Sequence, residues 1–215
     1  MLYIVTPLSR VENLENIVKS FPNICTRKNK HYQWYCVVDG KLDMKETGLL
    51  NKIQDLYRNF STLLPQISNS FVGHSHRNYF LNEMYSKKHI MYQHWSQSKK
   101  TDWVYFLDDD TLLHPDFLET IIPLLESNSD KAAIIFDQEN KDGSMRLFAN
   151  INQVKVCHID MGQYIVNLKK LPSDLRFKED DYCADGIFIE ELFSRVGPEQ
   201  FVVVNKTLST YNKLR

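Results

Sequence analysis

Short runs of apolar residues recur along the chain, and each run stops at a turn or at polar residues. Runs of ~4–8 apolar residues bounded in this way are typical of buried strands. The runs that predict strands lie at Leu2–Val5, Trp34–Val38, Trp103–Leu107, Ala132–Phe136 and Phe201–Val204.

Two segments between these runs place their apolar residues on one face of a helix. The two stripes are Phe80, Met84, Met91 and Trp95, and Leu118, Ile121, Ile122 and Leu125. Pro115 precedes the second stripe and suits the first turn of a helix. Strands that alternate with helices predict an α/β fold with a mostly parallel sheet covered on both faces.

Residues 41–71 do not fit one pattern. Apolar spacing between Leu49 and Phe60 indicates a helix, whereas Pro65 and the Ser/Asn-rich stretch after it indicate a loop. We interpret this segment as an insertion. Because the sequence has no internal repeat and no Pro/Gly-rich linker, we expect one domain over residues 1–215.

Size and charge narrow the possible functions. Of 215 residues, 43% are hydrophobic and 25% charged, so one domain can bury a sizeable core. The formal net charge is -1, and Lys and Arg are scattered along the chain, whereas nucleic-acid binders concentrate basic residues on one face. We expect no nucleic-acid partner.

Two further features bear on the compartment. The first apolar run stops at Pro7 without a preceding basic segment, and no stretch approaches the ~20 apolar residues that cross a bilayer. We therefore expect no membrane anchor in this chain and a cytoplasmic location. Because Cys25, Cys36, Cys157 and Cys183 form no C-x-x-C pair, we expect buried free thiols.

The most informative segment is the apolar run at residues 103–107, which stops at Asp108, Asp109 and Asp110. Adjacent carboxylates repel each other and need a counter-charge. Ligands of open α/β sheets bind beyond the carboxyl ends of the strands, so the cluster predicts a divalent cation that bridges carboxylates and a diphosphate. Hard oxygen ligands favour Mn²⁺ or Mg²⁺. The alternative is a solvated acidic turn that caps the next helix.

Several segments together resemble the GT-A glycosyltransferases, most closely the animal β-1,3-glucuronyltransferases and the broad inverting family 2. The turn V-T-P-L-S-R after the first strand is similar to the glucuronyltransferase T-P-x-x-x-R, with one residue fewer before the Arg, which implies nucleotide contacts from Thr6, Pro7 and Arg10. The second strand ends at Asp39, where the family places an acidic residue on the uracil.

Three later motifs extend the resemblance. G-H-S-H-R-N looks like the family's G-x-x-x-R-N helix start, which implies that Arg77 approaches the nucleotide. Y-F-L-D-D-D matches Y-F-x-D-D-D, which implies Asp110 on the metal, Asp108 as a second metal ligand, and Asp108 or Asp109 on the ribose or a metal-bound water. D-M-G-Q-Y-I-V-N resembles the strand below the sugar pocket, where Asp160 is either near the donor sugar or a satisfied buried carboxylate.

The resemblance implies a single Rossmann-like GT-A domain with a mixed, mostly parallel sheet. Residues 1–110 would form the nucleotide-binding half and residues 111–215 the sugar and acceptor half. It also implies a UDP-sugar donor, a glycan or glycoprotein acceptor and a Mn²⁺ or Mg²⁺ cofactor. The chain is similar as well to the N-terminal domain of a chlorella-virus-encoded glycosyltransferase, which implies further domains of a longer polypeptide and the host cytoplasm.

One departure from the family lies near the C-terminus. The glucuronyltransferases carry a His and an Arg there that contact the diphosphate and metal, whereas this chain has Tyr211 and Lys213. Lys213 can serve the diphosphate, but Tyr211 cannot replace a histidine ligand. The metal would then depend more on the Asp cluster, the phosphates and water.

An inverting transfer needs a carboxylate that removes the proton of the acceptor hydroxyl. Aligning E-L at residues 191–192 with the family's R-E-L helix places Asp185 at the position of the catalytic Glu. Asp185 can also be a helix N-cap, and the E-D signature of family 2 would instead select Asp180 or Asp181. Without a base, a retaining transfer is the alternative.

Two other functions stay open. A nucleotidyltransferase acting on a sugar phosphate also needs acidic metal ligands, but it usually has a Gly-rich basic loop after its first strand, and this turn has no glycine. A carbohydrate-binding module without catalysis would carry the Asp cluster as surface charge.

Overall fold

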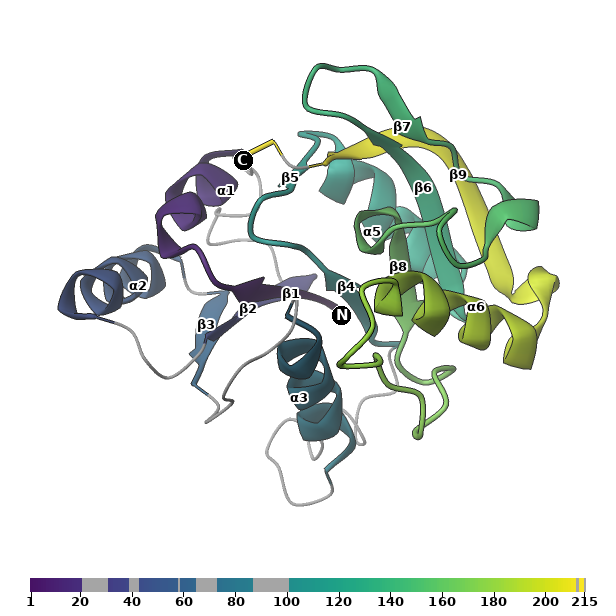
Figure 1. The fold of residues 1–215 in the computed structure, drawn as a ribbon, viewed down its shortest axis with the longest axis horizontal. Helices are drawn as coiled ribbons and strands as arrows, with labels where there is room; N and C mark the ends of the chain where they lie inside the picture. Colours follow the sequence, from purple (N-terminus) through teal and green to yellow (C-terminus); the bar gives the residue numbers. More distant parts are fainter. Residues whose placement is uncertain are drawn as a thin grey trace.

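A computed structural model describes residues 1–20, 31–38, 43–57, 59–64, 73–86, 101–211 and 213–214 (Figure 1). Its strands are β1 (Leu2–Leu8), β2 (Tyr32–Val38), β3 (Phe60–Leu63), β4 (Trp103–Phe106), β5 (Leu112–Leu113), β6 (Ala133–Glu139), β7 (Met145–Leu147), β8 (Tyr164–Asn167) and β9 (Phe201–Thr210). Its α-helices are α1 (Leu14–Ser20), α2 (Met44–Leu56), α3 (His74–Tyr85), α5 (Phe117–Ser127) and α6 (Ala184–Val196). Short 3-10 turns are η1 (Val11–Asn13), η3 (Ile151–Gln153), η4 (Met161–Gln163) and η5 (Pro198–Gln200).

The strands of the described residues form one mixed sheet in the order β3-β2-β1-β4-β8-β6-β9-β5, with β7 paired to β6. The first four strands in this order are parallel to one another, as are β6 and β9. Strand β8 runs antiparallel to both β4 and β6 and joins the two parallel groups. The predicted α/β class with a mostly parallel, mixed sheet is therefore confirmed.

Helices cover both faces of this sheet. Side chains alternate between the two faces along each strand, so an apolar strand needs cover on both sides. In β4, Trp103 and Tyr105 enter the core below α1, α2 and α5, whereas Val104 and Phe106 enter the core below α3 and α6. The side chains of β6 alternate between the same two cores. With helices on both sides, every residue of β4 is buried, which is why its sequence is apolar throughout.

Each predicted strand is present, but the interpretation of residues 41–71 as an insertion is wrong. Strand β3 pairs in parallel with β2 and forms an edge of the sheet. Helix α2 before it begins with a capping box in which Asp43 and Glu46 exchange hydrogen bonds with each other's backbone. In the first predicted stripe, Phe80 and Met84 lie on α3, while Met91 and Trp95 lie outside the described residues.

The strand directions bring several chain segments to one edge of the sheet, here the row of strand ends at which β1 and β4 finish. Strands β1 and β4 end there, and because β8 is antiparallel to β4, the turn η4 that precedes β8 lies there too. By the same reasoning β6 and β9 also end at this edge.

No described helix is long and apolar enough to cross a bilayer.

Candidate functional site

A pocket of about 670 Å³ opens at this edge of the sheet, which is within the usual range for small-molecule sites. Its walls come from the end of β1, the start of α3, the turn after β4, β7, the loop before η4 and the start of α6. The predicted site residues among those that line it are Pro7, Arg10, Arg77, Asp108, Asp109, Asp110, Asp160 and Asp185.

Asp109 is held by the protein itself. Its carboxylate accepts hydrogen bonds from the backbone N–H groups of Ser9 (2.7 Å) and Arg10 (2.8 Å), from the Ser9 hydroxyl and from the Arg10 guanidinium. The side chain of Asn13 donates to the Asp109 carbonyl at 2.9 Å. Since the residue is 2% exposed, its bonding fixes the turn after β1 against the end of β4.

Asp110 and Asp108 are paired with two different arginines. Nη2 of Arg10 lies 3.0 Å from Oδ2 of Asp110 and also contacts Asp109. Nη2 of Arg77 donates to Oδ1 of Asp108. Repulsion within the acidic turn is therefore offset by guanidinium groups, and a cation is not needed for that purpose. About a third of the Asp108 side chain, 34%, remains exposed.

Arg77 is fixed in its position, because only 2% of its surface is exposed. Its Nη1 lies 2.7 Å from Nδ1 of His74, and its guanidinium lies 5.7 Å from the centroid of the Phe177 ring. Burial and the charge of Arg77 lower the pKa of His74 to about 4, so this imidazole is neutral at pH 7 and can accept from Arg77. Arg77 thus holds Asp108 at the pocket wall, and its predicted approach to the nucleotide stays a prediction.

Sequence reasoning missed Arg146, a residue of β7. Its Nη1 lies 3.1 Å from Oδ2 of Asp160, and its guanidinium carbon lies 3.7 Å from the centroid of the Tyr211 ring. No motif marks Arg146, since only the β6–β7 hairpin and the end of β9 bring these groups together. Tyr211 takes part as the surface on which this cation rests.

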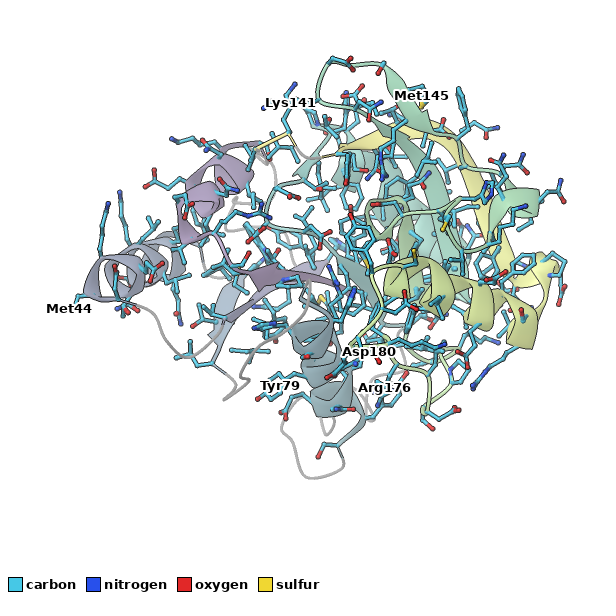
Figure 2. All side chains as sticks on the ribbon, viewed as in Figure 1. Met44, Tyr79, Lys141, Met145, Arg176 and Asp180 are labelled. Atoms are coloured by element: carbon cyan, nitrogen blue, oxygen red, sulfur yellow. The ribbon has the colours of Figure 1, made fainter. Side chains whose placement is uncertain are left out.

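Lys213 does not line the pocket. Its Nζ donates to the carbonyl of Lys141 at 2.8 Å. Figure 2 shows Lys141 at the outer turn between β6 and β7. The diphosphate contact predicted for Lys213 has no support from this placement and stays untested, whereas Arg146 carries positive charge on this side of the pocket lining.

Asp160 begins η4 and has several partners. Its side chain accepts from the N–H of Gly162 at 2.9 Å, and the side chain of Gln163 accepts from the Asp160 backbone, which completes a capping box. With Arg146 on its other oxygen, Asp160 is a largely satisfied carboxylate that lines the pocket, and its place near the donor sugar stays a prediction.

Asp185 lies in the first turn of α6, and its interpretation as an N-cap is wrong because Cys183 is the N-cap. Its oxygens accept from the N–H of Gly186 (2.8 Å) and of Met161 (3.2 Å). Burial, and then the charge of Asp160, raise the pKa of Asp185 from 3.8 to about 6, against the effect of its hydrogen bonds. A carboxylate with this pKa is ionised at pH 7 and is a stronger base than an ordinary Asp.

The alternative bases lie elsewhere. Asp180 is exposed and does not line the pocket. Asp181 also does not line the pocket, and it accepts from the N–H of Cys183 at 2.8 Å.

Three further residues predicted to contact the nucleotide have different placements. Thr6 is completely buried, and its hydroxyl accepts from Nε1 of Trp34 at 2.9 Å, so Thr6 stabilises the β1–β2 pair and does not line the pocket. Asp39 lies outside the described residues. Pro7 lines the pocket and packs against Gly73, where an added Cβ would lie 2.8 Å from the Pro7 ring.

A divalent cation fits the charge of the pocket. Its described lining residues carry five carboxylates and three guanidinium groups, an acidic excess that would oppose an anionic ligand without a cation. Asp108 and Asp110 offer hard oxygen ligands. Among the residues that the structure describes, no group of three or more His, Cys, Asp or Glu side chains is arranged to hold a metal ion. The remaining ligands would thus come from a bound anion and water.

Of the three cysteines that the structure describes, only Cys36 meets the expectation of a buried thiol, because it lies in the core. Cys157 is exposed, Cys183 is partly exposed, and both line the pocket. Cys25 lies outside the described residues.

No protein-family model and no curated protein sequence matches the chain. Among solved structures, residues 1–349 of S. aureus TarS align with a TM-score of 0.67 and 14% identity, covering 97% of this chain and 59% of TarS 1–349. The longer TarS structure aligns with a TM-score of 0.66 and 13% identity, covering 97% of this chain and 36% of TarS. The mannosyltransferase PcManGT from Pyrobaculum calidifontis, in complex with GDP-Man and Mn²⁺, aligns with a TM-score of 0.63 and 7% identity, covering 98% of this chain and 56% of PcManGT.

The chain thus spans less than two thirds of the length of each of these structures. TarS 1–349 has also been solved in complex with UDP-GlcNAc, and this structure aligns with a TM-score of 0.65. The common feature is a curled central sheet flanked by helices. This chain therefore has the GT-A fold of these glycosyltransferases.

Proposed function

We propose that the chain is a glycosyltransferase that moves a sugar from a UDP-sugar to an acceptor hydroxyl with inversion, assisted by Mn²⁺ or Mg²⁺. One observation carries the proposal: the acidic turn after β4 and Asp185 at the start of α6 line the same pocket. This pocket lies at the strand ends, where α/β proteins bind their ligands. The GT-A fold and the complexes of its structural neighbours with UDP-GlcNAc and GDP-Man support the assignment.

The acidic turn would bind the donor diphosphate through the cation. Asp110 and Asp108 would hold the cation, which stabilises the negative charge that develops on the leaving nucleoside diphosphate. Arg10, fixed by Asp109, and Arg146, resting on Tyr211, would bind phosphate oxygens or the sugar directly. Asp39 would accept the N–H of the uracil ring, as the resemblance implies.

Asp185 would act as the general base. Since its pKa is about 6, it is mostly ionised at pH 7 and still basic enough to take the proton of the acceptor hydroxyl as that oxygen attacks the anomeric carbon. The hydrogen bonds from Gly186 and Met161 hold the carboxylate in one orientation. In this proposal residues 1–110 bind the nucleotide, residues 111–215 contribute Arg146 and Asp185 to the sugar side, and the protein acts in the cytoplasm on a glycan or glycoprotein.

The test combines nucleotide binding and turnover. Calorimetry should show that UDP binds more tightly with Mn²⁺ than without it, and a donor screen should show release of nucleoside diphosphate. Asp110→Asn should remove the dependence of UDP binding on Mn²⁺. Asp130→Asn is the matched control, because 70% of the Asp130 side chain is exposed and it does not line the pocket.

Two results would reject the proposal. Metal-independent UDP binding that is equal in wild type and Asp110→Asn would remove the assigned cation site. Release of pyrophosphate from a nucleoside triphosphate, in place of nucleoside diphosphate from a sugar donor, would identify a nucleotidyltransferase.

A further inference from the structure

The sulfur atoms of Cys157 and Cys183 lie 3.7 Å apart, within the range of an S–H···S hydrogen bond. The two residues are separated by 26 positions in the sequence and belong to different segments, the loop before η4 and the N-cap of α6. Both line the pocket, and neither is buried, so a dissolved reagent can reach them. The tertiary structure thus creates an accessible pair of thiols.

Three contacts hold the two segments together around these thiols. The N–H of Val156 donates to Glu190 at 3.3 Å, and the N–H of Met161 donates to Asp185 at 3.2 Å. Gly186 packs so closely that an added Cβ would lie 3.0 Å from Cα of Val156. The loop therefore packs against the first two turns of α6, on either side of Cys157.

The backbone of Cys157 is unusual, because its φ of 66° lies in the left-handed region that is unfavourable for residues other than Gly. This conformation belongs to the loop position that brings the side chain to Cys183. A disulfide needs an S–S distance of ~2.05 Å, so the two sulfurs would have to approach by under ~2 Å. Side-chain rotation with a small shift of an exposed loop can supply such a movement.

We propose that Cys157 and Cys183 form a thiol–disulfide exchange site that takes a low-molecular-weight disulfide such as oxidised glutathione. The thiolate of one cysteine attacks the glutathione disulfide, which forms a mixed disulfide and releases one glutathione thiolate. The second cysteine loses its proton, attacks the protein sulfur and releases the second glutathione. Two protein thiols are oxidised to one disulfide, and one oxidised glutathione is reduced to two thiols.

The environment of the pair sets its reactivity. The hydrogen bond with Cys157, burial and the charges of Cys157, Asp181 and Asp185 raise the pKa of Cys183. Because the thiolate is the attacking species, exchange at this residue should be slow at neutral pH and faster as the pH rises.

The cross-link would change the pocket on one side only, and this part of the inference rests on the proposed function. Cys183 is two residues before Asp185, and Cys157 is three residues before Asp160. A disulfide that draws the two segments together would move the proposed base, and a misplacement of ~1 Å can cost ~10²-fold in rate. The turn after β1 and the acidic turn after β4 belong to other segments, so UDP binding should persist.

The first test maps the bond in the full chain. After incubation with oxidised glutathione and alkylation of the remaining thiols, mass spectrometry of a digest should show the Cys157 and Cys183 peptides joined, with the loss of two hydrogens. Cys157→Ser and Cys183→Ser should each show only a glutathione adduct on the remaining partner. Cys36→Ala is the matched control that should retain the cross-link, because Cys36 is buried away from the pocket. Alkylation of both residues after oxidation, or a cross-link to another cysteine, would overturn the inference.

The second test compares oxidised and reduced protein. UDP affinity should stay within about twofold, while turnover falls at least tenfold and returns after dithiothreitol treatment. Turnover of the double variant Cys157→Ser/Cys183→Ser should not respond to oxidised glutathione, because neither pocket thiol remains to form an adduct or a cross-link. A mapped cross-link in a protein without sugar transfer would support the exchange site and reject the proposed function. Sugar transfer without a cross-link would support the proposed function and reject the exchange site.

Discussion

Replacing Asp185 by Asn removes the proposed proton acceptor and changes little else. Asn has nearly the same size, and its carbonyl oxygen can still accept the N–H of Gly186 or of Met161, which now bind the carboxylate at 2.8 and 3.2 Å. Loss of a general base lowers turnover by roughly 10²–10⁴-fold. Binding of the donor should be unchanged, because the nucleotide side of the pocket is formed by other segments.

The same substitution has an unusual consequence for stability. Burial raises the pKa of Asp185 from 3.8 to about 6, so the folded protein binds its proton more tightly than the unfolded chain does. The free energy of unfolding therefore decreases as the pH rises from about 4 through about 6, and the ionised side chain costs on the order of 3 kcal/mol above that range. Asn carries no charge, so Asp185→Asn should be at least as stable as the wild type at pH 7, after a small loss from weaker hydrogen bonds.

The assay is nucleoside-diphosphate release with the donor found by screening, together with urea denaturation at pH 4, 5, 6 and 7. In the wild type, kcat/KM should rise with pH through about 6 and then level off, since the ionised form is the base. Asp180→Asn is the matched control, because Asp180 is exposed and lies outside the pocket lining.

Three results would refute the reasoning. Near-normal turnover in Asp185→Asn would exclude a base role for this residue. A product that keeps the donor's anomeric configuration would indicate a retaining mechanism. A large loss of stability in Asp185→Asn would mean that the carboxylate is needed for the fold, and the fall in turnover could not then be assigned to catalysis.

Three further predictions each concern the substitution or specificity of one residue. Asp39 should make UDP bind more tightly than CDP by ~1.5–3 kcal/mol, since cytosine lacks the ring N–H donor, and equal calorimetric affinities would contradict this. Arg146→Ala should weaken UDP-sugar binding about tenfold while Lys213→Ala does not, because only Arg146 lines the pocket; the reverse order would exclude the role given to Arg146. Asp109→Asn should lower the free energy of unfolding by about 2 kcal/mol in urea titrations, because the Asp109 carboxylate is 2% exposed and accepts hydrogen bonds from a guanidinium and from backbone N–H groups. A change below about 0.5 kcal/mol would show that the turn does not depend on this charge.

The sequence by itself determined the five strands that are continuous apolar runs, and the position of the acidic turn, but not the short strands β3, β5 and β7. A strand buried on both faces must be apolar throughout, as β4 is, and this requirement is visible in a run of neighbouring residues. The abrupt change from Phe106 and Leu107 to three carboxylates is likewise local. Because strand ends meet at one edge of an α/β sheet, such a change also predicts where the pocket lies.

The tertiary structure decided which side chains share the pocket and what they contact. Arg146 faces Asp160 and Tyr211 only because β7 pairs with β6 and β9 ends beside them. Asp109 looks like Asp108 and Asp110 in the sequence, yet its carboxylate is used by the turn after β1. The Cys157 and Cys183 thiols meet across 26 positions in the same way. A pattern of neighbouring residues cannot predict such pairs, because their contact depends on how distant segments pack against each other. The packing of the whole sheet provides the free energy that stabilises each contact.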